Sequence, residues 1–403
     1  MRIFVQIAAY RDAELCPTLH SMFDNAADPD AISVGLCWQY ADDEDLGDFA
    51  VDPRIRRVGV PAVKSRGVCW ARSITQALYQ GEEFTLQLDS HHRFAPGWDR
   101  TLINAYEALR LEGIEKPIIT AYLPPYEPGV PQEEWSTQPL RISFGGFTQH
   151  GPWAVKSEYV EEPELSSLEP ARFLSGHFLF AEGSFCKNVP YDPHLYFFGE
   201  EQSLSVRAYS HGYRFFHPLF VCCWHHYGRT AMPKHWSDDS QWWAKNERSL
   251  RRYNTLLRDA HSTTSQQTHG LGTVRSLDSY AAYTGVDAAT RTVSTSALRG
   301  GPAPADDPSE PEARPYSALR VPVDARDFAL DGERLSFVYV GAHDDQGREL
   351  FRHDLTGGQL KTALRDGYVD LDFEASSRYV SWTVWPHAEK LGWLEAKRIP
   401  VYW

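Results

Sequence analysis

The sequence predicts an α/β domain built on a mostly parallel sheet, then a proline-rich linker, then a small all-β domain that resembles a sandwich. Three observations support this prediction. Strand-like and helix-like segments alternate over roughly the first 125 residues. Residues 299–315 contain five prolines and several acidic residues but no large apolar residue, which is typical of an extended linker. Short β-branched and aromatic runs follow. We place the domains at 1–295 and 317–403, with the linker at 296–316.

The first domain opens with apolar runs that read as strands. These are IFVQIAAY at 3–10, ISVGLCW at 32–38 and FTLQL at 84–88. The segments at 69–81 and 98–110 carry apolar residues at helical spacing. Because helices separate the strands, the sheet is expected to be mostly parallel.

The rest of the first domain is less regular. A strand within 116–123 is stopped by Pro124 and Pro125, and the Pro-rich, Gly-rich stretch at 126–172 reads as a long irregular insertion. Order returns at 173–185, and we expect a helix at 199–212 and a strand at 218–227.

Five short runs after the linker predict strands of an antiparallel sandwich. Turn signals, including HDDQG and LTGG, separate them. The runs are LSFVYV, ELFRHDL, GYVDLDF, RYVSWTVW and KRIPVYW.

Composition excludes several classes of protein. With 40 basic and 54 acidic residues among 403, the net charge of -14 disfavours nucleic acid and anionic membranes as partners. No apolar run approaches the ~18 residues that span a bilayer, and the N-terminal segment lacks the pattern of a signal peptide. The 6 cysteines show no metal-ligand spacing. We therefore expect a soluble, cytoplasmic protein without a disulfide framework.

A cluster of polar residues follows the strand at 84–88. Asp89 and His91 project to the same side of an extended chain, on either side of Ser90. One carboxylate and one imidazole form half of a site for a divalent cation, with Mn²⁺ favoured and Mg²⁺ an alternative. Alternatively, Asp89 caps the next turn beside an exposed histidine.

A second pair of candidate ligands ends the strand-like run at 218–227. Alternation allows either His225 or His226 to face the first cluster, but not both. Otherwise, tandem histidines at a strand end are surface residues.

Three cations surround a glycine at the start of the helix near residue 68. Lys64, Arg66 and Arg72 lie close to Gly67, where free backbone N–H groups suit an anion. They could equally be a solvated helix start. Neither a P-loop nor a GxGxxG motif is present, so NTP hydrolysis through that loop and a nicotinamide cofactor are not supported.

Paired carboxylates, Glu200 and Glu201, follow Gly199 at the start of another predicted helix. The helix dipole favours acidic residues in a first turn in any case. A carboxylate that opens into a cleft could also accept a hydrogen bond from an acceptor or sugar hydroxyl.

Seven segments, spanning about residues 1 to 290, together resemble a known family. In this order they are similar to the GlcNAc-transferase family that includes the cytoplasmic polypeptide hydroxyproline α-N-acetylglucosaminyltransferases, and more distantly to the polypeptide N-acetylgalactosaminyltransferases. The resemblance implies a Rossmann-like GT-A fold, a UDP-sugar donor, a divalent cation and retention of anomeric configuration. The segments are IAAYRD, SRGVCWAR, LQLDSHHRFAPGWD, SGHFLFAEGSF, PYDPHLYFFGEEQSLSVRAYSHGYRFFHP, WHHYGR and GTVRSLDSYAAYTGVD.

The resemblance also implies roles for individual residues. Asp89 and His91 match the metal-binding DxH motif, and His225 matches the histidine of an HxYxR motif. Glu200 and Glu201 match a GEE motif near the acceptor and are assigned as catalytic. One departure is His92, where a methionine is usual. The positions assigned to donor binding are Ala9, Tyr10, Arg11, Arg66, Gly67, Arg72, Ser90 and Arg229.

These assignments predict a retaining, metal-dependent transferase that moves a sugar, N-acetylglucosamine by resemblance, from a UDP-sugar to a hydroxyl of a protein, peptide or glycan. Two alternatives belong to other classes. One is a metal-dependent hydrolase of a nucleotide sugar or phosphate ester. The other is a non-catalytic carbohydrate-binding protein whose active part is the C-terminal sandwich.

Overall fold

The computed structural model describes most of the chain as two compact units. The first comprises 1–143, 157–280 and 302–307, and the second comprises 144–156, 281–301 and 308–403. The predicted bounds at 295 and 316 stay predictions. The described residues are 1–41, 43–148, 153–161, 167–228, 232–258, 268–288, 290–304, 316–324, 328, 334–374 and 379–401.

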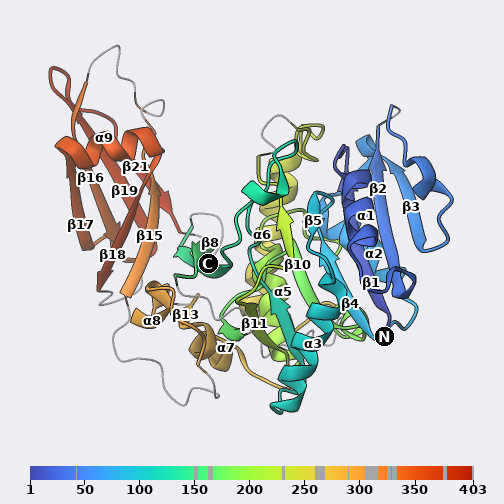
Figure 1. Ribbon diagram of the computed structural model, residues 1–403. Helices are drawn as coiled ribbons and strands as arrows, with labels where there is room; N and C mark the ends of the chain where they lie inside the picture. Colours follow the sequence, from blue (N-terminus) through green and yellow to red (C-terminus); the bar gives the residue numbers. More distant parts are fainter. Residues whose placement is uncertain are drawn as a thin grey trace. The chain divides into compact units, whose positions relative to one another are not determined.

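An eight-stranded sheet forms the centre of the first unit (Figure 1). Strands β1, β2, β3, β4, β6 and β11 point the same way, while β9 and β10 run antiparallel to their neighbours. The sheet is therefore mixed but mostly parallel, as predicted. Across the sheet the order is β3 (Ile55–Pro61), β2 (Ile32–Tyr40), β1 (Ile3–Tyr10), β4 (Phe84–Leu88), β10 (Phe178–Glu182), β6 (Pro117–Thr120), β11 (Arg214–Pro218) and β9 (Leu168–Ala171).

Helices cover both faces of this sheet, and the central strands are buried on both sides. One side is apolar, while the other carries Gln6, Thr85 and Gln87, which are buried and hydrogen-bonded. Ile3, Val5 and Ile7 of β1 share one core with apolar residues of α1 (Leu15–Asp24) and α3 (Trp98–Leu111). Phe4 alternates to the other face, where α2 (Val68–Ala77) packs on β1 and β2. Further α-helices in the described part of this unit are α4 (Phe185–Asn188), α5 (Glu200–Ser210), α6 (Trp242–Arg258) and the start of α7 (Leu277–Thr284).

A small two-stranded sheet lies after the end of β4. It pairs β5 (His92–Phe94) with β12 (Cys223–His225) in antiparallel register, with His92 opposite His225. The single strand predicted at 218–227 is wrong in this respect. Pro218 ends β11, since proline has no amide hydrogen for the ladder, and the chain re-enters a different sheet at Cys223.

The stretch at 126–172 is more regular than predicted. It contains β7 (Leu140–Gly146) and β8 (Ala154–Tyr159), which pair with each other, as well as edge strand β9. In β7 the apolar residues Leu140, Ile142 and Phe144 are buried in strand alternation. Some of the residues that suggested an irregular insertion lie within these strands: Gly145 and Gly146 end β7, and Pro170 lies in edge strand β9.

The second unit contains two antiparallel sheets whose facing sides share a core with one helix. That helix, α9 (Gly357–Asp366), corrects the all-β prediction: the LTGG segment starts a helix, and Leu360 and Ala363 bury one side of it. A short helix, α8 (Thr295–Leu298), lies earlier in the chain.

The strands of the two sheets follow in their order across each sheet. The first sheet is β13 (Val286–Asp287), β14 (Thr292–Val293), β15 (Tyr316–Pro322) and β18 (Tyr368–Glu374). The second sheet is β17 (Glu349–Thr356), β16 (Leu335–His343), β19 (Ser381–Ala388) and β20 (Gly392–Trp393), with β21 (Lys397–Pro400) also paired to β19.

Among the described residues, none of the helices combines the length and the apolar character that a bilayer crossing requires. The cytoplasmic location stays a prediction.

Candidate metal and donor site

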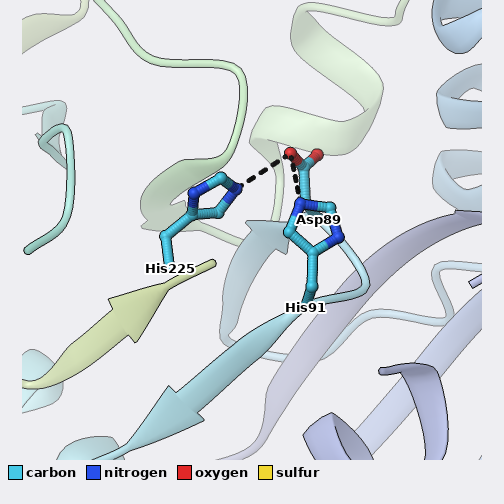
Figure 2. Close-up of side chains that lie close together, drawn as sticks. All are labelled: Asp89, His91 and His225. Atoms are coloured by element: carbon cyan, nitrogen blue, oxygen red, sulfur yellow. Dashed lines mark hydrogen bonds and ion pairs between the residues drawn. The ribbon is translucent and has the colours of Figure 1, made fainter. Parts of the chain in front are cut away.

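Three potential metal ligands converge beyond the carboxyl end of β4. The Oδ2 atom of Asp89 lies 3.4 Å from Nε2 of His225 and 3.6 Å from Nε2 of His91. One ligand atom from each residue lies within 4.8 Å of the other two. Figure 2 shows both imidazole rings turned toward the carboxylate, each rising from its own short strand region. This group of one oxygen and two nitrogen donors suits a divalent transition ion such as Mn²⁺.

Backbone pairing between distant segments brings the three side chains together. The fully buried strand β4 ends at Leu88, so Asp89 emerges at the carboxyl end of this strand. The His226 amide donates to the His91 carbonyl at 3.1 Å, and the His225 amide donates to the Pro124 carbonyl at 3.0 Å. The strand β12 is thereby held between the DSH segment and the segment that follows β6.

The two adjacent histidines point in different directions. While His225 faces Asp89, His226 places Nε2 3.1 Å from Oε2 of Glu127, a residue with a largely exposed side chain. In this geometry, His225 is the histidine of the pair that joins Asp89 and His91.

Asp12 supports the His91 ring from behind. The wholly buried carboxylate places Oδ2 2.8 Å from Nδ1 of His91, and the same oxygen accepts from the Ser90 hydroxyl. A carboxylate on one ring nitrogen fixes the tautomer and makes the other nitrogen a better metal ligand. His91 therefore presents Nε2 to Asp89, and Ser90 supports Asp12.

Arg72 connects Asp89 to Glu200. Its guanidinium lies 2.7 Å from Oδ1 of Asp89 and 3.0 Å from Oε1 of Glu200, and it also donates to the Tyr191 hydroxyl. Burial alone would raise the pKa of Asp89, but the hydrogen bond from His225 and the charge of Arg72 lower that pKa well below its usual range. Asp89 is therefore ionised and available to a cation.

Glu201 occupies the next position and has a different environment. It accepts from the backbone N–H of Gly176 at 2.7 Å and from the Tyr122 hydroxyl at 3.3 Å. Burial, and then the nearby charge of Glu200, raise the pKa of Glu201 to about 7. Its carboxyl can therefore exchange a proton near neutral pH.

Two buried histidine rings and the partly exposed ring of Tyr227 surround His225. The ring centroids of His177 and Tyr227 lie 4.4 Å and 4.2 Å from that of His225, and His92 lies at 4.9 Å. Burial, and then the neighbouring His225, lower the pKa of His92 and His177 well below the ordinary range. These two rings are therefore neutral and pack beside the candidate ligands.

The remaining donor-binding candidates lie in several environments. Ala9 is buried at the end of β1, whereas the Tyr10 hydroxyl and the Arg11 guanidinium both contact Asp238, at 2.6 and 2.7 Å. Arg66 is exposed over the Trp70 ring. Arg229 lies outside the described residues.

Gly67 permits a close approach at the start of α2. A Cβ on this residue would lie 2.3 Å from the Tyr196 carbonyl oxygen, and its φ of +101° is also one that favours glycine. The amide of the next residue, Val68, donates to that same carbonyl.

Comparison with known proteins assigns the family. A family model described as Glycosyltransferase (GlcNAc) matches residues 2–53 and 45–290. The chain belongs to this glycosyltransferase family. No curated protein matches the chain in sequence.

Several solved structures are similar to this glycosyltransferase. GalNAc-T7 with UDP, GalNAc and Mn²⁺ has a TM-score of 0.49 and 14% identity, and the match covers 70% of this chain and 56% of that one. TarS residues 1–349 from S. aureus, in complex with UDP-GlcNAc, has a TM-score of 0.34 and 14% identity over 67% of this chain and 78% of that one. A longer S. aureus TarS structure has a TM-score of 0.34 and 10% identity over 99% and 77%.

Sequence reasoning missed two residues with clear structural roles in this glycosyltransferase. Asp12 holds His91, and Tyr191 bridges Arg72 and Glu200. Asp12 follows the apolar strand β1, but only the adjacency of β1 and β4 in the sheet brings it to His91, so the sequence carries no local signal for its role.

Proposed function

We propose that this glycosyltransferase is a retaining, metal-dependent GT-A enzyme that transfers N-acetylglucosamine from UDP-GlcNAc to a hydroxyl of a protein, peptide or glycan. The observation that carries the proposal is the convergence of Asp89, His91 and His225 in a chain of the GlcNAc glycosyltransferase family. The UDP-sugar donor, the retention of configuration and the acceptor class are supported by the resemblance of the sequence motifs to that family.

The three residues fit a divalent cation chemically. Asp89 is kept ionised, and Asp12 engages Nδ1 of His91 so that Nε2 can coordinate. A cation bound by Asp89, His91 and His225 would supply positive charge to the diphosphate of the donor as its bond to the sugar breaks.

We assign the remaining roles to neighbouring residues. Arg72 fixes the Asp89 carboxylate through Oδ1 and leaves Oδ2 directed at the two imidazoles. Glu200 and Glu201 orient the acceptor hydroxyl, which attacks from the face that the diphosphate leaves. The acceptor proton passes to a phosphate oxygen or to Glu201, whose pKa suits this exchange.

UDP release tests this function. The enzyme with Mn²⁺ should release UDP from UDP-GlcNAc faster than from UDP-glucose or UDP-galactose, and a hydroxyl acceptor should accelerate the release. NMR of the product should show an α-linkage, which is the configuration of the donor. If the rate of UDP release is the same in the presence and absence of each acceptor tested, the hydrolase is favoured. A β-linked product would contradict retention.

A further inference from the structure

The outer face of the five-stranded sheet in the second unit carries a cluster of aromatic side chains. Tyr339 lies opposite Trp385 across β16 and β19, Phe337 lies opposite His387, and His387 lies opposite Trp393 of β20. Cross-strand partners project to the same side of a sheet. The alternating residues, including Val338, Val340 and Val384, point to the buried core. The aromatic cluster therefore faces away from that core.

Two tryptophans form the exposed part of this cluster. Trp385 is 40% exposed and Trp393 is 47% exposed, with ring centroids 4.4 Å apart and ring planes tilted by 38°. The Trp385 indole N–H donates to the Leu394 carbonyl at 2.8 Å, and Phe337 and His387 pack against Trp393. The two rings are thus held in place before any ligand arrives, which limits the entropy lost on binding.

Polar groups border the rings. Arg352 and Asp354 form a bidentate ion pair whose side chains are both exposed, on the strand beside Tyr339. The Ser336 hydroxyl lies 2.9 Å from Nδ1 of His387. Fixed aromatic rings beside hydrogen-bond donors and acceptors offer a ligand both an apolar surface and polar partners.

We propose that this face binds a carbohydrate. A pyranose ring has an apolar C–H face that can stack on indole and a rim of hydroxyls that can bond to Arg352, Asp354 and His387. The size of the patch disfavours a second copy of the chain. Two tryptophans that are each less than half exposed offer on the order of 200 Å², whereas a stable interface buries about 800 Å² on each partner. The proposal does not depend on the transfer activity.

Titration calorimetry of the full chain with cellotetraose, chitotetraose and mannotetraose tests this site. We expect saturable binding of at least one sugar. Binding should weaken by roughly tenfold or more in Trp385→Ala and in Trp393→Ala. Trp385→Phe keeps an aromatic ring for stacking and should retain most of the affinity. This variant separates the loss of the stacking ring from a loss of folding in Trp385→Ala.

Two further variants locate the binding. Trp243→Ala removes a tryptophan that is 61% exposed in the first unit and should leave sugar affinity unchanged. Asp89→Ala should also leave it unchanged; loss of binding there would move the sugar to the transfer site and overturn the proposal. Absence of binding for all three sugars would also overturn the proposal, as would equal affinity in the unaltered protein and both tryptophan-to-alanine variants. A dimer in light scattering that Trp385→Ala dissociates would instead assign the face to a second copy of the chain and overturn the proposal as well.

Discussion

The Nε2 atom of His225 lies 3.4 Å from Oδ2 of Asp89, although 136 residues separate the two along the chain. The pairing of β5 with β12 sets this distance, because it places His92 and His225 directly opposite each other. The candidate metal site therefore depends on the correct register of a short two-stranded sheet as well as on the ligands themselves. Residues that hydrogen-bond to the candidate metal ligands, such as Asp12 and Arg72, can therefore be tested by mutation as parts of the site.

Asp12→Asn should weaken Mn²⁺ binding by about 10- to 100-fold, because a neutral amide polarises His91 less than a carboxylate does. Electron paramagnetic resonance of free Mn²⁺ during titration measures this. Asp48→Asn, at an exposed position, is the matched control and should bind Mn²⁺ like the unaltered protein. Equal affinity in the two variants would show that Asp12 has no role in tuning His91.

Arg72→Ala should destabilise the fold by roughly 3–5 kcal/mol, because it leaves Glu200 as a buried carboxylate without its cation. Arg72→Lys should recover part of that stability but not the activity, since one ammonium cannot reproduce the contacts to Asp89, Glu200 and Tyr191. Urea unfolding and UDP release measure the two effects. Full activity in Arg72→Lys would argue that the guanidinium geometry is unimportant.

Glu201 should make the folded protein less stable as the pH rises. Its pKa is raised from 4.5 to about 7 in the folded state, so the folded state binds more protons than the unfolded state between these values. The stabilisation is fully present below pH ~4.5 and is lost as the pH rises through ~7, by roughly 3 kcal/mol in total. Unfolding of metal-free protein against pH, compared with Glu201→Gln, isolates this effect. Parallel stability profiles for the two proteins would mean that Glu201 titrates normally.

Gly67→Ala should destabilise the first unit more than Gly81→Ala does. Both glycines have a strongly positive φ, +101° and +97°, but a Cβ would meet the Tyr196 carbonyl only at Gly67, with nothing within 4 Å at Gly81. The difference between their unfolding temperatures therefore reports the close backbone approach rather than the strained φ. If both variants lose a similar amount of stability, the positive φ alone accounts for the destabilisation.

Sequence reasoning identified the parts of the site that follow from local geometry. Strand alternation placed Asp89 and His91 on one side, and apolar runs located β1, β2 and β4. Alternation also showed that His225 and His226 cannot both face the site. It could not choose between them, because that depends on which side of β12 meets Asp89 and which meets Glu127.

Other features depend on contacts that no local pattern encodes. Asp12 reaches His91 because β1 lies next to β4, and strand order is not readable from a single strand. The helix α9 was hidden because its first two residues are glycines that resemble a turn, while its stability comes from Leu360 and Ala363 in the core. The pairing of β7 with β8 was hidden because β7 ends in two glycines, Gly145 and Gly146, in a part of the sequence that is rich in proline and glycine.

Mn²⁺ titration of His225→Ala beside His226→Ala tests the central claim most directly, since the two variants remove the same side chain from adjacent positions. Circular dichroism would first confirm that both are folded. We predict that His225→Ala lowers Mn²⁺ affinity by more than about a hundredfold, beyond the loss typical of an outer-sphere residue, and abolishes UDP release. His226→Ala should retain the affinity of the unaltered protein. Unchanged Mn²⁺ binding in His225→Ala, or loss confined to His226→Ala, would contradict the proposed site.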